Sequence, residues 1–165
     1  MITKIYTDSS LDEKRGIAGI GIYIVRGAQN ETISNWIKTD DNNYAELWAI
    51  YQASILGHGK NCIICTDSQS AIQYIKGDEN PERPRTQEQY IRYKHMQFLA
   101  CKIRKLNPRI EWTKGHLKYY QENAIGNSIA DSLSKQGRAK YYKQQHDNEA
   151  LSMEYIKHKK GKDRK

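Results

Sequence analysis

The chain has 165 residues, 38% of them hydrophobic, and a formal net charge of +8 with an isoelectric point of about 9.3. This length fits one domain with a real core, and the positive charge favours a polyanionic partner. The longest apolar run, residues 17–25, is too short to cross a membrane, and a strand predicted at the N-terminus leaves no room for a secretory signal. We therefore expect a soluble, cytoplasmic protein.

Hydrophobic patterning predicts three strands and a helix in the first third of the chain. Apolar residues occupy the even positions from Ile20 to Ile24, the period-two pattern of a strand. A charged turn at 11–16 and a glycine-containing turn at 27–30 separate the strands, which indicates an antiparallel meander. The predicted strands cover residues 2–7, 17–25 and 32–38, and the helix covers residues 44–56.

The rest of the chain alternates helices with two further strands. They are predicted as a strand at 62–66, helices at 68–76 and 87–106, a strand at 109–113 and a last helix from 127 to about 140. A strand–helix–strand unit after a meander implies a mixed sheet with helices packed against it. We expect one domain over residues 1–140, followed by a flexible, polar extension at 141–165. Residues 157–165 hold six basic residues and one acid, a net charge of +5.

The three cysteines, Cys62, Cys65 and Cys101, form an odd set that indicates a reducing compartment. Cys62 and Cys65 match the C-x-x-C pattern, but they fall in a predicted strand, where residues three apart point to opposite faces. No second pair completes a zinc site. The pattern therefore favours small buried side chains over metal or redox chemistry.

Four carboxylates recur in similar settings. Asp8 follows the first strand and Asp67 follows the fourth, while Glu46 lies near the start of the first helix and Asp131 lies in the last one. Acids that converge on one point cannot all stay ionised cheaply unless cations neutralise them. Carboxylate oxygens suit Mg²⁺ or Mn²⁺, so the four acids form a candidate two-metal site for phosphoryl transfer.

Each acid also has a structural alternative. Asp8 could start an Asx turn, and Asp67 could cap the helix that follows it. Asn43-x-x-Glu46 resembles a capping box, and Asp131 could simply be solvated. Glu46, however, shares a helix face with small alanines suited to close packing on a sheet, where a desolvated acid is costly without a cation. Together the four settings favour the metal site.

Four sequence blocks, taken in order, carry a family resemblance. They are Thr7-Asp8-Ser9-Ser10, Asn42-Asn43-Tyr44-Ala45-Glu46-Leu47, Thr66-Asp67-Ser68-Gln69, and Glu111-Trp112-Thr113-Lys114-Gly115-His116 leading to Asn127 and Ala130-Asp131. With these blocks the chain resembles the ribonuclease H family, type 1, over residues 1 to about 137. The resemblance implies a ribonuclease H-like α/β fold, with a five-stranded mixed sheet flanked by helices. The implied activity is endonucleolytic cutting of the RNA strand in RNA–DNA hybrids, leaving 5′-phosphates.

The resemblance also implies roles for individual residues. Two Mg²⁺ ions, or Mn²⁺ in their place, would be held by Asp8, Glu46, Asp67 and Asp131. His116 resembles the mobile histidine near the scissile phosphate. Contacts with the hybrid would come from Ser10, Asn42, Asn43 and Gln69.

The chain departs from the family pattern in three places. Asp41 stands where the family usually has a threonine that helps to hold a DNA phosphate; Arg15 or a different local conformation would have to compensate for its charge. The basic helical protrusion of some members is missing, because only residues 77–86 separate two predicted helices. His116 and Asp131 are also joined by a longer loop than in compact bacterial members.

Other functions stay open on the sequence alone. One is a catalytically inactive nucleic-acid-binding module of the same fold, and another is a different nuclease or a recombinase of the same superfamily. A lone surface residue is the alternative for His116. Lys94, Lys102 and Lys105 fit a solvated helix face, with substrate binding as the lesser alternative. We expect the protein to be a monomer.

Overall fold

The computed structural model describes residues 1–77, 84–114 and 122–162. It contains one five-stranded sheet with the strand order β3-β2-β1-β4-β5. The strands are β1 (Thr3–Asp12), β2 (Ile17–Arg26), β3 (Gln29–Lys38), β4 (Cys62–Thr66) and β5 (Ile110–Trp112). The first three pair antiparallel, while β4 runs parallel to β1 and β5 parallel to β4. The mixed α/β sheet expected from the sequence is confirmed.

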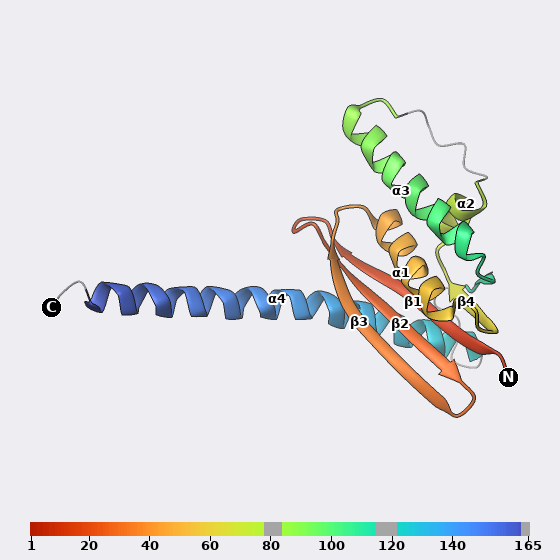
Figure 1. Cartoon of the computed structure of the whole chain (residues 1–165), viewed down its shortest axis with the longest axis horizontal. Coiled ribbons are helices and arrows are strands. Elements are labelled where there is room, and N and C mark those ends of the chain that lie inside the picture. Colours follow the sequence, from red (N-terminus) through yellow and green to blue (C-terminus); the bar gives the residue numbers. More distant parts are fainter. Residues whose placement is uncertain (78–83, 115–121, 163–165) are drawn as a thin grey trace.

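The helices cover the two faces of this sheet unequally (Figure 1). They are α1 (Asn42–Gly57), α2 (Gln69–Lys76), α3 (Gln87–Leu106) and α4 (Glu122–Lys162). On one face α1 packs against β1, β2 and β4, and α2 and α3 pack beside it. On the other face α4 crosses β1, β2 and β3. The larger core therefore lies between the sheet and α1, with α3 as an outer layer on α1 and α2.

Strand β2 shows how its alternating sequence serves both faces. Its even-numbered residues Ile20, Ile22 and Ile24 are buried in the larger core. Its glycines face α4: a Cβ on Gly21 would lie 2.0 Å from the carbonyl oxygen of Ala130, and one on Gly19 would meet the same helix. Because real Cβ atoms do not approach a backbone oxygen so closely, glycine here lets the backbone of α4 lie directly on the strand.

Strand β1 is longer than expected, and this corrects the placement of Asp8. The strand does not end at Thr7; it continues to Asp12. Its parallel pairing with β4, however, stops at the pair Thr7–Thr66, whereas its pairing with β2 continues, with Asp8 opposite Gly21. Asp8 is therefore mid-strand, at the first position where β4 no longer covers the edge of β1.

Two of the structural alternatives considered for the acids, both of them helix caps, are wrong. The N-cap of α1 is Asp41, whose Oδ1 accepts a hydrogen bond from the Tyr44 backbone N–H at 3.1 Å, so Asn43 and Glu46 do not form a capping box. The N-cap of α2 is Ser68 rather than Asp67. Glu46 therefore lies within α1, and Asp67 precedes the N-cap residue of α2. The expected bounds of α3, 87–106, and of β4, 62–66, are confirmed.

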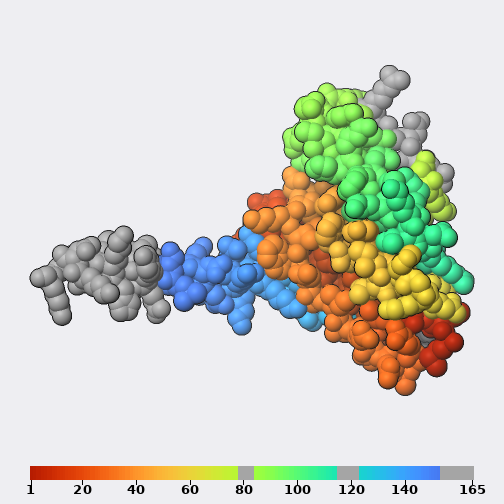
Figure 2. Space-filling view, in the orientation of Figure 1, coloured from red at the N-terminus to blue at the C-terminus, as the bar shows by residue number. Residues whose placement is uncertain are grey.

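The last helix differs most from the expectation of a helix over residues 127 to about 140. Instead, α4 runs from Glu122 to Lys162 as one helix that projects well beyond the sheet (Figures 1 and 2). Its last anchored turn is held by Tyr142, whose hydroxyl donates to Asp12 Oδ2 at 2.5 Å, and by Tyr141, which packs edge-on to Trp36. Periodicity could not find this extension, because an exposed helix carries no apolar stripe. The domain boundary at residue 140 and the flexibility of residues 141–165 stay predictions.

The cysteines and the apolar segments match the simpler interpretation of the sequence. Cys62 packs against the larger core, while Cys65 is buried in the second cluster on the opposite face, with Tyr6 and Ala130. All three cysteines lie among the described residues, and none of them forms a disulfide. Among the described residues, no helix is both long and apolar enough to cross a membrane.

Candidate active site

Three of the four carboxylates converge at one edge of the sheet. Asp8 of β1, Glu46 of α1 and Asp67, which follows β4, offer oxygens that lie within 4.8 Å of one another. The convergence follows from topology. Parallel β1 and β4 bring Thr7 and Thr66 side by side, so the next residue of each chain segment, Asp8 and Asp67, reaches the same point. The first turns of α1 cover this point and supply Glu46.

Ser9 ties two of these acids together. Its backbone N–H donates to Asp8 Oδ1 at 2.8 Å, and its hydroxyl donates to Glu46 Oε1 at 2.6 Å. The other oxygen of Glu46, Oε2, is buried and has no hydrogen-bond partner within the described chain. A buried acceptor without a partner is unfavourable, so this oxygen marks a place where a ligand would satisfy it. No sequence pattern indicated the bridging role of Ser9, apart from its place in the Thr-Asp-Ser block.

Burial and crowding shift the partly buried Asp8 and the buried Glu46 towards their neutral forms. Burial is the main cause that raises the pKa of Asp8 to about 7, and the negative charge of Asp67 is the second. Burial, and then the charge of Asp8, raise the pKa of Glu46 to about 8 against the hydrogen bond from Ser9, which lowers it. Each shift has the cause expected for carboxylates that share a site without a cation. The site therefore stores unfavourable electrostatic energy at neutral pH.

Asp131 joins the site from the opposite face of the sheet. It lies on α4 outside the group of three, and its charge is close enough to raise the pKa of Asp8. Its carboxylate is more exposed and forms an ion pair with Lys135 one turn along the helix, Nζ to Oδ2 at 2.7 Å. The structure thus brings three of the expected ligands together and places the fourth at their margin, already paired with a cation.

The donor set fits a hard divalent cation. All candidate ligands are carboxylate oxygens, and the buried Glu46 Oε2 lacks a partner within the described chain. The pKa values of Asp8 and Glu46 are raised by burial and then by neighbouring acids. A bound cation would reverse these shifts and satisfy the orphaned oxygen. The same oxygens suit Mg²⁺ and Mn²⁺ better than softer metals that prefer thiolate or imidazole.

The expected hybrid contacts surround this cluster at the starts of two helices. Asn42 and Gln69 are the exposed first residues of α1 and α2. Asn43 accepts a hydrogen bond from the Ser70 hydroxyl at 2.8 Å, which holds the two helix starts together. Ser10 lies in β1, partly buried, two residues after Asp8. The hybrid-binding roles of these residues stay predictions.

Arg15 contacts Tyr142 and Asp12. Its guanidinium lies 4.7 Å from the ring centre of Tyr142 and 3.8 Å from the Asp12 carboxylate, at the β1–β2 turn. This contact fastens the turn to α4 rather than offsetting the charge of Asp41. Its proposed part in phosphate binding stays a prediction.

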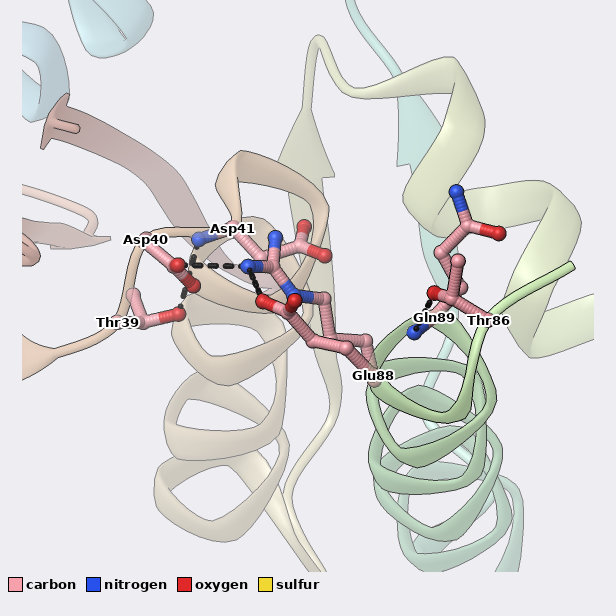
Figure 3. Close-up of polar contacts among 7 residues, drawn as sticks. Thr39, Asp40, Asp41, Thr86, Glu88 and Gln89 are labelled. Atoms are coloured by element: carbon pink, nitrogen blue, oxygen red, sulfur yellow. Dashed lines mark hydrogen bonds and ion pairs between the residues drawn. The ribbon is translucent and has the colours of Figure 1, made fainter. Parts of the chain in front are cut away.

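The local conformation around Asp41 instead explains why an acid is tolerated there. Figure 3 shows that Thr39, Asp40 and Asp41 lie opposite the first turn of α3. The Asp41 backbone N–H donates to Thr39 Oγ1 at 3.1 Å, while its carboxylate caps α1. Arg92 of α3 donates to Asp40 and to Glu88, each at 2.7 Å, and the bond to Asp40 links α3 to the segment just before α1. No sequence pattern indicated this ion-pair link, because its residues are 52 positions apart.

Only part of the last sequence block, which runs from Glu111 to His116 and leads to Asp131, lies among the described residues. His116 lies outside the described residues, so its expected role stays a prediction. Just before it, Thr113 is buried and its hydroxyl accepts a hydrogen bond from Asn127 Nδ2 at 2.7 Å. This bond ties the end of β5 to the first turns of α4, the helix that carries Asp131. Thr113 and Asn127 therefore set where α4 starts relative to the sheet.

A mixed sheet in this strand order, with acids converging where β1 and β4 part, defines a protein of the ribonuclease H-like fold. The model of the RNase H family matches residues 2–139. The chain therefore belongs to the RNase H family. It is similar to a ribonuclease H from Orientia tsutsugamushi (strain Boryong), with 29% identity over 153 residues that cover 88% of each chain.

Solved structures with the same fold include cellular and viral proteins. The RNase H1 of the halophilic archaeon Halobacterium salinarum NRC-1 superposes with a TM-score of 0.64 at 17% identity, covering 85% of this chain and 99% of that one. The protease–reverse transcriptase of prototype foamy virus gives a TM-score of 0.56 at 21% identity, covering 82% of this chain and 20% of that one. Because the sequence identities are only 17% and 21%, these two structural similarities show the fold alone.

Proposed function

We propose that this protein is an endoribonuclease that hydrolyses the RNA strand of RNA–DNA hybrids and requires Mg²⁺. The single observation that carries the proposal is the cluster of Asp8, Glu46 and Asp67 within 4.8 Å, with one buried carboxylate oxygen left without a partner. Family membership supplies the class of reaction, and the donor set supports the divalent cation.

The chain's own residues would hold the metal in a defined geometry. Asp8 projects from the central strand and is oriented by the Ser9 N–H, while the Ser9 hydroxyl fixes one oxygen of Glu46 and leaves the other free to coordinate. Asp67 completes this side, and Asp131 would complete the other after releasing Lys135. Two Mg²⁺ ions, when bound, supply a more acidic water and stabilise charge on the phosphate and leaving oxygen.

Recognition of the hybrid would come from the exposed starts of α1 and α2. Asn42 and Gln69 lie at adjoining helix N-termini, joined by the hydrogen bond between Asn43 and Ser70. Polar side chains there can read 2′-hydroxyls and groove shape, which distinguish an RNA strand from a DNA strand. Backbone N–H groups at helix N-termini also favour phosphates.

The test compares matched RNA–DNA, RNA–RNA and DNA–DNA duplexes of one sequence, with Mg²⁺ and with excess chelator. We expect cutting of the RNA in the hybrid alone, only with Mg²⁺, to products with 5′-phosphate and 3′-hydroxyl ends. Asp8→Asn should abolish it, because it removes the most central ligand. Asp147→Asn, an exposed acid on α4, is the matched control and should cut like the parent. Equal cutting of duplex DNA, or full activity in chelator, would contradict the proposal.

A further inference from the structure

A stripe of alternating aromatic and basic side chains runs along the outer face of α3. Tyr90, Lys94, Phe98 and Lys102 follow one another at four-residue spacing, which places them along one side of the helix. Lys94 lies 5.4 Å from the ring centre of Tyr90, and Lys102 lies 5.0 Å from that of Phe98. Tyr90 is 46% exposed and Phe98 is 64% exposed, although both are large rings.

This stripe is not used to build the fold. The opposite side of α3 makes the core contacts through the buried residues Met96, Leu99, Ala100 and Ile103. The helix contains one acid, Glu88, which is paired with Arg92 away from the stripe. Across the residues that the structure describes, neither Lys94 nor Lys102 forms an ion pair with a carboxylate. The stripe therefore presents only positive charge and aromatic surface to solvent.

We propose that this α3 stripe binds a single-stranded nucleic-acid segment that adjoins the hybrid. Exposed rings give unpaired bases a stacking platform, and lysines between them attract the phosphates, the combination that binds single strands without sequence preference. A duplex would not expose its base faces to these rings. An apolar protein partner would have to bury two lysine charges that form no ion pair with a carboxylate among the described residues.

The position and length of the stripe suit such a strand. The inference rests on the proposed function for the location of the hybrid, over the starts of α1 and α2. The N-terminal half of α3 is fastened to the segment just before α1 by the bond from Arg92 to Asp40 (Figure 3). From Tyr90 to Lys102 the helix rises about 18 Å, which matches about five nucleotides at the spacing of a stacked strand. The stripe thus leads away from the candidate active site along the outer layer of the molecule.

The experiment measures binding in chelator, so that no substrate is cut. Fluorescence anisotropy compares a blunt RNA–DNA hybrid with the same hybrid carrying a thymidine overhang of about eight nucleotides at either end. We expect the parent to bind an overhang substrate more tightly than the blunt one. Phe98→Ala should reduce this gain by roughly five- to a hundredfold, the range for loss of one stacked base. The charge reversals Lys94→Glu and Lys102→Glu should reduce it and flatten its salt dependence.

Three further variants separate stacking from other causes. Phe98→Trp should keep the gain because it keeps a stacking ring, whereas Phe98→Leu should lose it although it keeps an apolar side chain. Ile55→Ala on α1 removes a side chain as exposed, at 47%, as that of Tyr90 and should bind both substrates like the parent. Thermal unfolding of each variant, and its cutting of the blunt hybrid with Mg²⁺, should match the parent.

Equal binding of blunt and overhang substrates by the parent would overturn the inference, and so would an unchanged gain in Phe98→Ala. Retention of the gain in Phe98→Leu would show an apolar contact instead of stacking and would overturn it too. If overhang-dependent binding is found but no hybrid is cut, the proposed function fails while the α3 stripe stands. If hybrids are cut and the overhang does not tighten binding, the proposed function stands and the inference about the α3 stripe fails.

Discussion

Replacing Glu46 with glutamine should stabilise the metal-free protein at alkaline pH while removing its activity. Burial and the neighbouring Asp8 carboxylate raise the pKa of Glu46 from an ordinary value of 4.5 to about 8. Between these two values the folded protein keeps a proton that the unfolded chain has released. Unfolding therefore releases a proton, and stability falls as the pH rises from 4.5 towards 8. Glutamine carries no charge at any of these pH values, so the Glu46→Gln variant does not lose stability in this way as the pH rises.

The size of the effect follows from the same two values. A pKa difference of about 3.5 units corresponds to about 5 kcal/mol once the pH exceeds both values, and to about 4 kcal/mol at pH 8, where half of the folded molecules are already ionised. Glutamine keeps the oxygen that accepts from the Ser9 hydroxyl, so little hydrogen bonding is lost. At pH 4.5 and below, both side chains are neutral in the folded state, and the two proteins should be nearly equal in stability.

Urea unfolding in chelator, at pH 4.5 and at pH 8, measures this difference. We expect the free energy of unfolding of Glu46→Gln to exceed that of the parent by up to about 4 kcal/mol at pH 8 and by little at pH 4.5. Glu149→Gln, an exposed site on α4, is the control and should change neither value. Mg²⁺ should raise the stability of the parent at pH 8 more than that of the variant, because the cation binds the folded ligands. A variant less stable than the parent at pH 8 would refute the electrostatic reasoning and show that the Glu46 carboxylate supports the fold.

Three further outcomes are expected. Gly21→Ala should lower the free energy of unfolding by about 3 kcal/mol or more in urea titrations, because its Cβ would lie 2.0 Å from the Ala130 carbonyl oxygen; a loss under 1 kcal/mol would mean that α4 can shift. Deleting residues 157–165 removes a charge of +5, so hybrid affinity should fall and its salt dependence flatten, with turnover at saturating substrate little changed; an unfolded deletion variant would show that the segment packs. His116→Ala should lower turnover by roughly ten- to a thousandfold between pH 6 and pH 9, within or near the range for acid–base assistance; equality with the parent would make the histidine an ordinary surface residue.

Much of this protein was determined by local sequence. The alternation in β2 and the apolar face of α3 predicted their elements closely, because burial on one side leaves a period of two or of 3.6 in the sequence. The order of the predicted strands and helices indicated the mixed sheet, and the settings of the four acids indicated the candidate site, to which the family resemblance added expected roles. The predicted element bounds were wrong where the hydrophobic pattern carries no signal. Strand β1 continues past Thr7 through polar residues, and α4 extends past residue 140 with no apolar stripe to mark it.

What only the tertiary structure decided is how the acids meet and what surrounds them. Sequence placed Asp8 and Asp67 after strands, but their approach depends on the parallel pairing of β1 with β4, and that of Glu46 on the packing of α1 over the same edge. The unpartnered oxygen of Glu46, the hydroxyl of Ser9 and the raised pKa values are consequences of that approach. They join residues up to 59 positions apart, between Asp8 and Asp67, and electrostatic energy depends on distance in space, which a linear pattern does not contain.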